Sequence, residues 1–188
     1  MNTFFTSDEH YGHKNIINYS SRPFPGIEVM EEQLIARHNR RVAFTDTVYH
    51  LGDFSLDEKL VSRVMSQLRG RHILVPGNHD KCHPVHKKKR VDFTQYVRWG
   101  FDDVLPLQTT KHFPGLGEVL LCHMPYPGEH NKVHDTYAAF RPENQGMKLL
   151  HGHVHELWKK KGDLMLNVGV DQWDYAPVSL DEVIEAFK

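Results

Sequence analysis

The most informative stretch of this 188-residue chain is Leu74-Val75-Pro76-Gly77-Asn78-His79-Asp80. A short apolar run ends at a glycine, and three residues that can bind a metal ion or transfer a proton follow at once. A run of this length is typical of a buried strand. Loops at strand ends, held by a rigid sheet, are where functional sites are commonly built. We therefore interpret residues 74–80 as a strand that delivers polar side chains to a site.

The same pattern recurs four times, with apolar runs at residues 4–6, 48–51, 119–121 and 149–150. Each run is followed within a few residues by aspartate or histidine. The polar residues in question are Asp8, His10, Asp53, His123, His153 and His155. One such strand end would mean little, but five together predict a shared site.

Composition places the chain among ordinary globular proteins. It is 39% hydrophobic and 25% charged, and its formal net charge is −1. The near-zero charge creates no global field for nucleic acid, so any polyanion contact must be local. The length suits one domain, which we expect to span residues 1–188. The oligomeric state is left open.

Two cysteines, Cys82 and Cys122, argue against a disulfide framework and for a reducing compartment. The first residues lack the basic and apolar regions of a signal peptide, and no apolar run approaches membrane-spanning length. We therefore expect a cytoplasmic protein without a membrane partner. The 15 histidines are far more than a core needs.

Hydrophobic periodicity predicts strands interleaved with helices. Two helices have sequence signals for their starts, a capping box of Ser55 with Glu58 and another of Ser179 with Glu182. The expected strands are 2–6, 47–51, 72–76, 104–113, 118–123, 147–150 and 164–168, and the expected helices are 28–41, 55–70, a segment around 93–97 and one from 179 onward. Residues 104–113 and 118–123 should form a hairpin that turns at 114–117. These elements indicate an α/β fold or α+β layers.

The residues at the strand ends have the chemistry of a metal site. Asp8 and His10 are two apart, so both side chains would point the same way in an extended segment. Asp53 follows a glycine, which allows close approach of the backbone to an ion. A mixed set of oxygen and nitrogen ligands suits Mn²⁺, Fe²⁺, Zn²⁺ or Ni²⁺. With Asn78, His123, His153 and His155 the set is too large for one ion and suits two, about 3.5–4 Å apart, as in phosphoester hydrolysis.

The ordered motifs resemble the calcineurin-like metallophosphoesterase family. They are Asp8-x-His10, Gly52-Asp53, Gly77-Asn78-His79-Asp80, a lone His123 after a strand, and Gly152-His153-x-His155. Single motifs such as Gly-Asp are weak, whereas the ordered set is highly specific. The stretch from Ser7 to Asn15 is most similar to small bacterial and phage members of the family.

The resemblance implies a two-sheet β-sandwich flanked by helices, with a dinuclear centre at one edge. Asp8, His10 and His155 would hold one metal, and Asn78, His123 and His153 the other. Asp53 would bridge the two ions together with a hydroxide that attacks phosphorus, and Mn²⁺ is our first choice of metal. His79 would donate a proton or bind phosphate beside the site.

The resemblance leaves the substrate open. Protein phosphatases of the family continue Gly-Asp into an Asp-Arg pair, but residues 54–56 are Phe-Ser-Leu here, which argues against a phosphoprotein. The carboxylate that would orient His79 is unassigned, and Asp80 is adjacent to it. We expect a phosphodiester or a nucleotide as substrate. The alternatives are a phosphomonoesterase of the same mechanism and a non-catalytic scaffold of the same fold.

Several other residues have two interpretations. His13 and Lys14 could face the phosphate or pack their loop, whereas Arg22 and Arg141 are expected to be solvated rather than phosphate ligands. His38, His50 and His151 are expected in the core, and Cys122 as a small buried residue.

The basic tract Lys87–Arg90 could grip nucleic acid, but a solvated loop is favoured. Residues 124–146 could form a substrate-side wall, carrying Tyr126, His130, Lys132, His134, Tyr137, Phe140 and Arg141, or be a surface loop.

Overall fold

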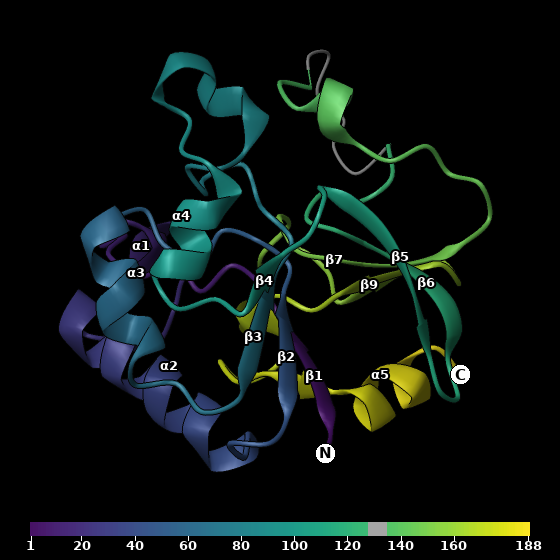
Figure 1. Cartoon of the computed structure of the whole chain (residues 1–188). Coiled ribbons are helices and arrows are strands. Elements are labelled where there is room, and N and C mark those ends of the chain that lie inside the picture. The colour runs from purple at the N-terminus through teal and green to yellow at the C-terminus, as the bar shows by residue number, and fades with distance from the viewer. Residues whose placement is uncertain (128–134) are drawn as a thin grey trace.

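The computed structural model describes residues 1–127 and 135–188. It contains two five-stranded sheets, ordered β10-β1-β2-β3-β4 and β5-β6-β7-β9-β8 (Figure 1). The strands of the first sheet are β1 (Thr3–Thr6), β2 (Thr47–His50), β3 (Arg71–Leu74), β4 (Asp103–Val104) and β10 (Val178–Ser179). Those of the second are β5 (Gln108–Phe113), β6 (Gly117–Cys122), β7 (Lys148–His151), β8 (Lys160–Lys161) and β9 (Met165–Asn167).

Both sheets mix parallel and antiparallel pairs. In the first sheet β1 to β4 are parallel, and β10 pairs antiparallel with β1. In the second sheet β6, β7 and β9 are parallel, while β5 and β8 run antiparallel at the two edges. The predicted hairpin is confirmed as β5–β6. Val104, however, belongs to β4 of the other sheet, so the expected strand 104–113 is split between the two sheets.

The helices from residues 16–98 cover the outer face of the first sheet, while the second sheet and the C-terminal helix lie on its other side (Figure 1). The helices are α1 (Ile16–Tyr19), α2 (Ile27–Arg41), α3 (Glu58–Met65), α4 (Phe93–Arg98) and α5 (Leu180–Ala186), with 3₁₀ turns at Pro84–Lys89, Ala138–Phe140 and Val170–Gln172. The mixed α/β sandwich that the sequence predicted is therefore confirmed. Within the described chain, none of the helices has the length and apolar character that a membrane span requires.

Two apolar clusters hold these layers together. One lies between the sheets and combines Phe5 from the first sheet with Leu121, Leu150 and Leu166 from the second. The other lies between the first sheet and its helices and includes Met30 and the neighbouring Leu34 of α2. Burial of such side chains contributes about 1.5–3 kcal/mol each relative to exposure. The sandwich is thus fixed on both faces of its first sheet.

One predicted capping box is confirmed and the other is wrong. The Ser179 hydroxyl accepts from the backbone N–H of Glu182, whose carboxylate accepts from the Ser179 N–H, so α5 begins where predicted. Helix α3 begins later than expected, because Asp57 caps it by accepting from the Lys59 N–H. Ser55 instead donates its hydroxyl to the Tyr11 carbonyl, 2.9 Å away, and ties two loops together.

The core contains a group of histidines, as predicted for His38 and His50. His50 Nε2 lies 3.0 Å from His72 Nδ1, and His38 Nε2 lies 2.9 Å from the Arg69 carbonyl. Burial lowers the pKa of His38 to about 4 and that of His50 to about 3. These histidines are therefore neutral in the folded protein at pH 7, which lets them pack among apolar side chains.

The lowered pKa of His38 makes stability fall in acid. In the unfolded state His38 is protonated below about pH 6.5, whereas in the folded state it is protonated only below about pH 4. The free energy of unfolding should therefore decrease between these pH values, by up to about 1.4 kcal/mol per pH unit from one such histidine. His38→Gln keeps a neutral donor at every pH and should reduce the slope by the contribution of one histidine, while His50 and the other buried histidines keep theirs. Urea unfolding of the chelator-treated protein between pH 7 and 4.5 measures how the free energy of unfolding depends on pH.

The exposed His112 provides the control for this experiment. His112→Gln makes the same substitution at an exposed position and so controls for the change of residue type. Identical slopes for wild type and His38→Gln would show that His38 is not held neutral by the fold.

Candidate metal centre

Five strand ends meet at one edge of the sandwich. Because β1, β2 and β3 are parallel, their carboxyl ends lie side by side, and the same holds for β6 and β7. An isolated bridge between Ser7 and Gly169 joins the two sheets at this edge. The residues that follow each strand are thereby brought together from distant parts of the sequence.

Two groups of potential metal ligands form there. Asp8, His10 and His155 each offer one atom of the first group, and the atoms lie within 4.8 Å of one another. Asp8, Asp53 and His123 form the second group under the same limit. Both groups are largely buried, and they share Asp8. The structure thus brings together five of the predicted ligands.

The Asp53 carboxylate, which belongs to the second group, also lies close to a histidine of the first group. Its Oδ2 is 3.7 Å from His10 Nε2 and 3.3 Å from His123 Nε2. Its Oδ1 accepts the backbone N–H of His79 at 2.8 Å. This carboxylate oxygen therefore lies within 4 Å of one histidine from each group.

Asn78 and His153 lie beside this centre. The His153 ring is 5.3 Å from that of His123, nearly perpendicular to it, and its backbone N–H donates to Asp8 Oδ2 at 3.0 Å. Asn78 is buried, and its Oδ1 makes no hydrogen bond within the described chain. His153 is therefore in contact with the converging ligands, and Asn78 directly precedes His79, whose backbone N–H binds Asp53.

The hydrogen bonding of three buried polar atoms indicates whether this site fits metal ions. His10 Nε2, His123 Nε2 and Asn78 Oδ1 have no hydrogen-bond partner in the part of the chain that the structure describes. A buried polar atom without a partner costs about 1–3 kcal/mol. His123 Nδ1 lies 2.7 Å from the Leu51 carbonyl, which fixes the proton there and leaves Nε2 free for a metal. The donor set fits divalent transition metals.

The backbone at the centre is strained. Asp8, His10, Asp53, His153 and His155 all have positive φ, between 45° and 71°. Non-glycine residues rarely adopt this conformation, and it persists where surrounding structure enforces it, often at functional sites. Our expectation of an extended segment at Asp8 and His10 is therefore wrong. The two side chains converge because the backbone turns at each residue, not because it alternates.

Three glycines allow the loops to approach each other. A Cβ at Gly52 would lie 2.3 Å from the Gly77 nitrogen, and one at Gly77 would lie 2.3 Å from Asp53 Oδ1. A Cβ at Gly152 would lie 2.0 Å from Ser7 Oγ. No larger residue fits without displacing a ligand loop. The glycine in each motif is thus explained by close backbone packing.

The role of Asp80 is structural. Its carboxylate is buried and accepts three backbone N–H groups, from Asp53 at 2.8 Å, Phe54 at 3.1 Å and Gly77 at 2.8 Å. These bonds join the loops after β2 and β3. Asp80 therefore fixes the backbone that carries Asp53.

Two aspartates give the centre a negative character. Burial lowers the pKa of His10 far below its usual value, so its ring is neutral. Burial opposes protonation of His123 too, but the Asp53 carboxylate, with Asp8 and the Leu51 carbonyl, outweighs it and raises the pKa to about 10. Burial likewise opposes protonation of His155, but Asp8 and Asp171 together outweigh it and raise the pKa of His155. A bound cation would displace these protons, so metal affinity is coupled to pH.

Asp171 is a residue of the centre that we did not predict. Its Oδ2 lies 3.1 Å from His155 Nδ1, which leaves Nε2 directed toward Asp8 at 3.9 Å. Carboxylates often orient metal-binding histidines in this way. A signal was present in the sequence, because Asp171 follows the apolar run 164–168 and a glycine.

Arg22 corrects a second expectation, since we predicted a solvated side chain. It is buried and forms two hydrogen bonds with the Asp171 carboxylate, at 2.8 and 2.9 Å. It also donates to the carbonyls of Asp8 and Glu9. Arg22 thus connects the loop that follows β1 with Asp171. Its donors are used by protein atoms rather than by a phosphate.

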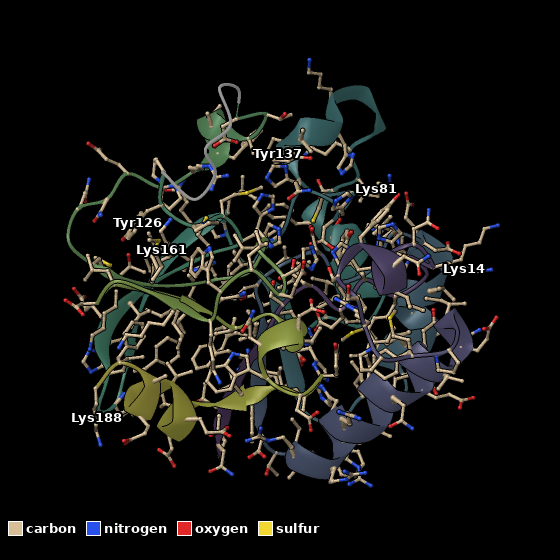
Figure 2. All side chains as sticks on the ribbon, turned by 180° about the vertical axis from the view of Figure 1, so that it is seen from behind. Lys14, Lys81, Tyr126, Tyr137, Lys161 and Lys188 are labelled. Carbon is tan, nitrogen blue, oxygen red and sulfur yellow. The ribbon has the colours of Figure 1, made fainter. Side chains whose placement is uncertain are left out.

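His79 stands at the rim of the centre. Its Nε2 lies 3.9 Å from Asp53 Oδ2, and 42% of its side chain is exposed. Its ring is 5.4 Å from the His10 ring and 6.5 Å from the His13 ring. His13 therefore faces the site, whereas Lys14 is exposed at the periphery (Figure 2).

The segment 124–146 is partly described, and residues 128–134, including His130, Lys132 and His134, lie outside the described residues. Tyr137 reaches the centre, with its ring 5.6 Å from that of His153. Tyr126 is buried and donates to the Met147 carbonyl. Arg141 is buried and binds Asp135 and the Pro125 carbonyl, so our prediction of a solvated side chain is wrong.

The remaining predictions concern residues away from the ligands. Cys122 and His151 are buried, as expected, and His151 Nδ1 lies 2.8 Å from the Gly152 carbonyl. In the basic tract, Arg90 donates to the Cys82 carbonyl at 2.9 Å. Arg90 is therefore bound at its own loop.

Comparisons with known proteins agree with this geometry. The 30% identical Gene 66 protein of Mycobacterium phage L5 matches over 98% of this chain and 93% of its own. An uncharacterized protein of Methanocaldococcus jannaschii is 28% identical, over 97% of this chain and 89% of its own. The crystal structure of a protein of unknown function from Aquifex aeolicus has a TM-score of 0.70 and 27% identity, with 98% of both chains covered.

The family comparison covers nearly the whole chain. Residues 1–175 match the calcineurin-like phosphoesterase superfamily domain. This range includes every strand end that contributes to the centre. The chain therefore belongs to the calcineurin-like phosphoesterase superfamily.

Proposed function

We propose that residues 1–188 form one domain that hydrolyses a phosphodiester or nucleotide-type ester with two divalent transition-metal ions. Membership of the superfamily supports metal-dependent phosphoester hydrolysis. The observation that carries the proposal is that three buried atoms, His10 Nε2, His123 Nε2 and Asn78 Oδ1, make no hydrogen bond in the described part of the chain and lie beside two carboxylates.

Each ion would have its own ligands. Asp8, His10 and His155 would hold one ion, and Asn78, His123 and His153 the other. Asp53 would serve both, which its position between His10 and His123 supports. Manganese is our first choice, with iron, zinc and nickel as the other metals that suit these ligands.

The ions would supply Lewis-acid chemistry, activating water and neutralising charge on the phosphate oxygens. The chain would supply the proton for the leaving alcohol. His79 suits this role because its backbone is fixed by the Asp53 carboxylate while its ring stays accessible at the rim. A positioned histidine of this kind typically contributes 10²–10⁴-fold to the rate.

Tyr137 supports the proposal that segment 124–146 forms a wall on the substrate side. Burial raises the pKa of its hydroxyl, and a hydrogen bond with the Asn78 side chain acts in the opposite direction. The hydroxyl is therefore protonated at neutral pH and can donate to a phosphate oxygen. In Figure 2 Tyr137 lies apart from Tyr126, which packs in the same segment.

Removal of the Asp53 carboxylate should disturb both metal positions. Wild type incubated with Mn²⁺ and desalted should retain about two ions per chain by elemental mass spectrometry. Asp53→Ala should retain less than one and lose turnover of bis-p-nitrophenyl phosphate. The exposed Asp163→Ala serves as control. Full metal content and turnover in Asp53→Ala would refute the bridging role.

His79→Ala should keep both metals and lose about 10²–10⁴-fold in kcat. The loss should be largest for alkoxide leaving groups and smaller for p-nitrophenolate, which needs little protonation. Steady-state kinetics on both kinds of ester, with His112→Ala as the matched control, measure it. An equal loss for both leaving groups would mean that His79 positions phosphate instead.

Tyr137→Phe removes one hydroxyl from the wall. We expect unchanged metal content and a KM about tenfold higher, since a hydrogen bond to a charged group is worth about 1.5–3 kcal/mol. Tyr126→Phe removes a hydroxyl from the same segment but away from the centre, and its KM should be normal. If both variants behave like wild type, the wall has no part in substrate binding.

A further inference from the structure

A cavity of about 370 Å³ opens beside the metal centre. It shares His10, His79, His153 and His155 with the centre, and its remaining wall is largely apolar. We call it the side cavity and define its apolar wall by Ile16, Tyr19, Val154 and Leu157. Its size lies in the range typical of small-molecule sites.

Two side chains of this wall are exposed although they are apolar. Tyr19 is 68% exposed and Leu157 is 59% exposed, and both are among the few large hydrophobic residues on the described surface. Ile16 and Val154 are buried and form the base of the same wall. Exposed apolar residues that gather beside a polar site mark a binding surface.

Aromatic rings connect the centre with this wall. The His13 ring lies 5.4 Å from the ring of His10 and 5.9 Å from the ring of Tyr19, tilted by 57° and 71°. His79 adds another ring, 6.5 Å from His13. The side cavity is therefore lined by ring faces and edges from the metal ligands outward, which suits a planar aromatic guest.

The charges of the side cavity disfavour an anionic guest. Its lining includes Glu156 but no lysine or arginine from the part of the chain that the structure describes. A second phosphate group would therefore meet a carboxylate and no permanent cation. The apolar wall with its one carboxylate therefore favours an uncharged part of the substrate in the side cavity.

We propose that the side cavity binds the leaving alcohol of the ester, and that this alcohol carries an uncharged planar ring, as a nucleoside or an aryl alcohol does. This inference rests on the proposed function. It assigns the leaving group to the side cavity because His79, which would protonate the leaving oxygen, forms part of the cavity wall. Tyr19 and Leu157 then determine specificity for the ring.

Binding of three non-hydrolysable phosphonates to the Mn²⁺-loaded protein tests this assignment by calorimetry. Phenylphosphonate should bind about tenfold more tightly than methylphosphonate, because the ring buries apolar area in the side cavity. The affinity of butylphosphonate should exceed that of methylphosphonate by a smaller factor, because butyl lacks a ring face. The double variant Tyr19→Ser/Leu157→Ser should lose the phenyl preference and keep its affinity for methylphosphonate.

Phe44 provides a matched control, since it is an aromatic residue with 77% exposure that does not line the side cavity. Phe44→Ser should keep the phenyl preference. A phenyl preference that survives in the double variant, or an equal gain from butyl, would overturn this inference while phosphonate binding still supported the metal centre. If none of the phosphonates binds and no ester is hydrolysed, the proposed function fails and the inference with it.

Discussion

The architecture of the centre depends on the buried carboxylate of Asp80. It accepts backbone N–H groups from Asp53, Phe54 and Gly77 and so joins the loops that follow β2 and β3. A carboxylate that accepts several backbone N–H bonds can remain buried without a cationic partner. Because Asp53 belongs to one ligand group and lies 3.7 Å from His10 of the other, these bonds fix a carboxylate that is close to both groups.

Close approach of the loops has a conformational cost. Five of the proposed ligands adopt left-handed backbone conformations, which cost about 1–3 kcal/mol each for non-glycine residues. Hydrogen bonds from the surrounding core offset this cost, as where the Asp8 N–H donates to the Gly52 carbonyl and the His10 N–H to that of Asp53. The ligand backbone is thus held by hydrogen bonds within the protein, and such support favours metal binding at a fixed geometry.

The two sides of the centre differ in polarity. Tyr137 brings a polar hydroxyl to Asn78 and His153. The side cavity next to His79 is apolar and aromatic, and Tyr19 and Leu157 remain exposed there. A phosphate ester has the same division between an anionic group and an organic group. The proposed substrate orientation follows from matching these two parts.

Local sequence determined which residues could serve and where strands would end. Each apolar run followed by glycine, aspartate or histidine marked a strand end, because a buried strand and potential metal ligands can both be recognised from a few consecutive residues. Tertiary structure alone decided the rest. It placed Arg22 against Asp171 across 149 residues, turned the backbone at Asp8 and His10, and brought Tyr19 and Leu157 to one cavity. Such contacts depend on how the loops of the two sheets meet. A local sequence pattern does not specify which distant residues come into contact.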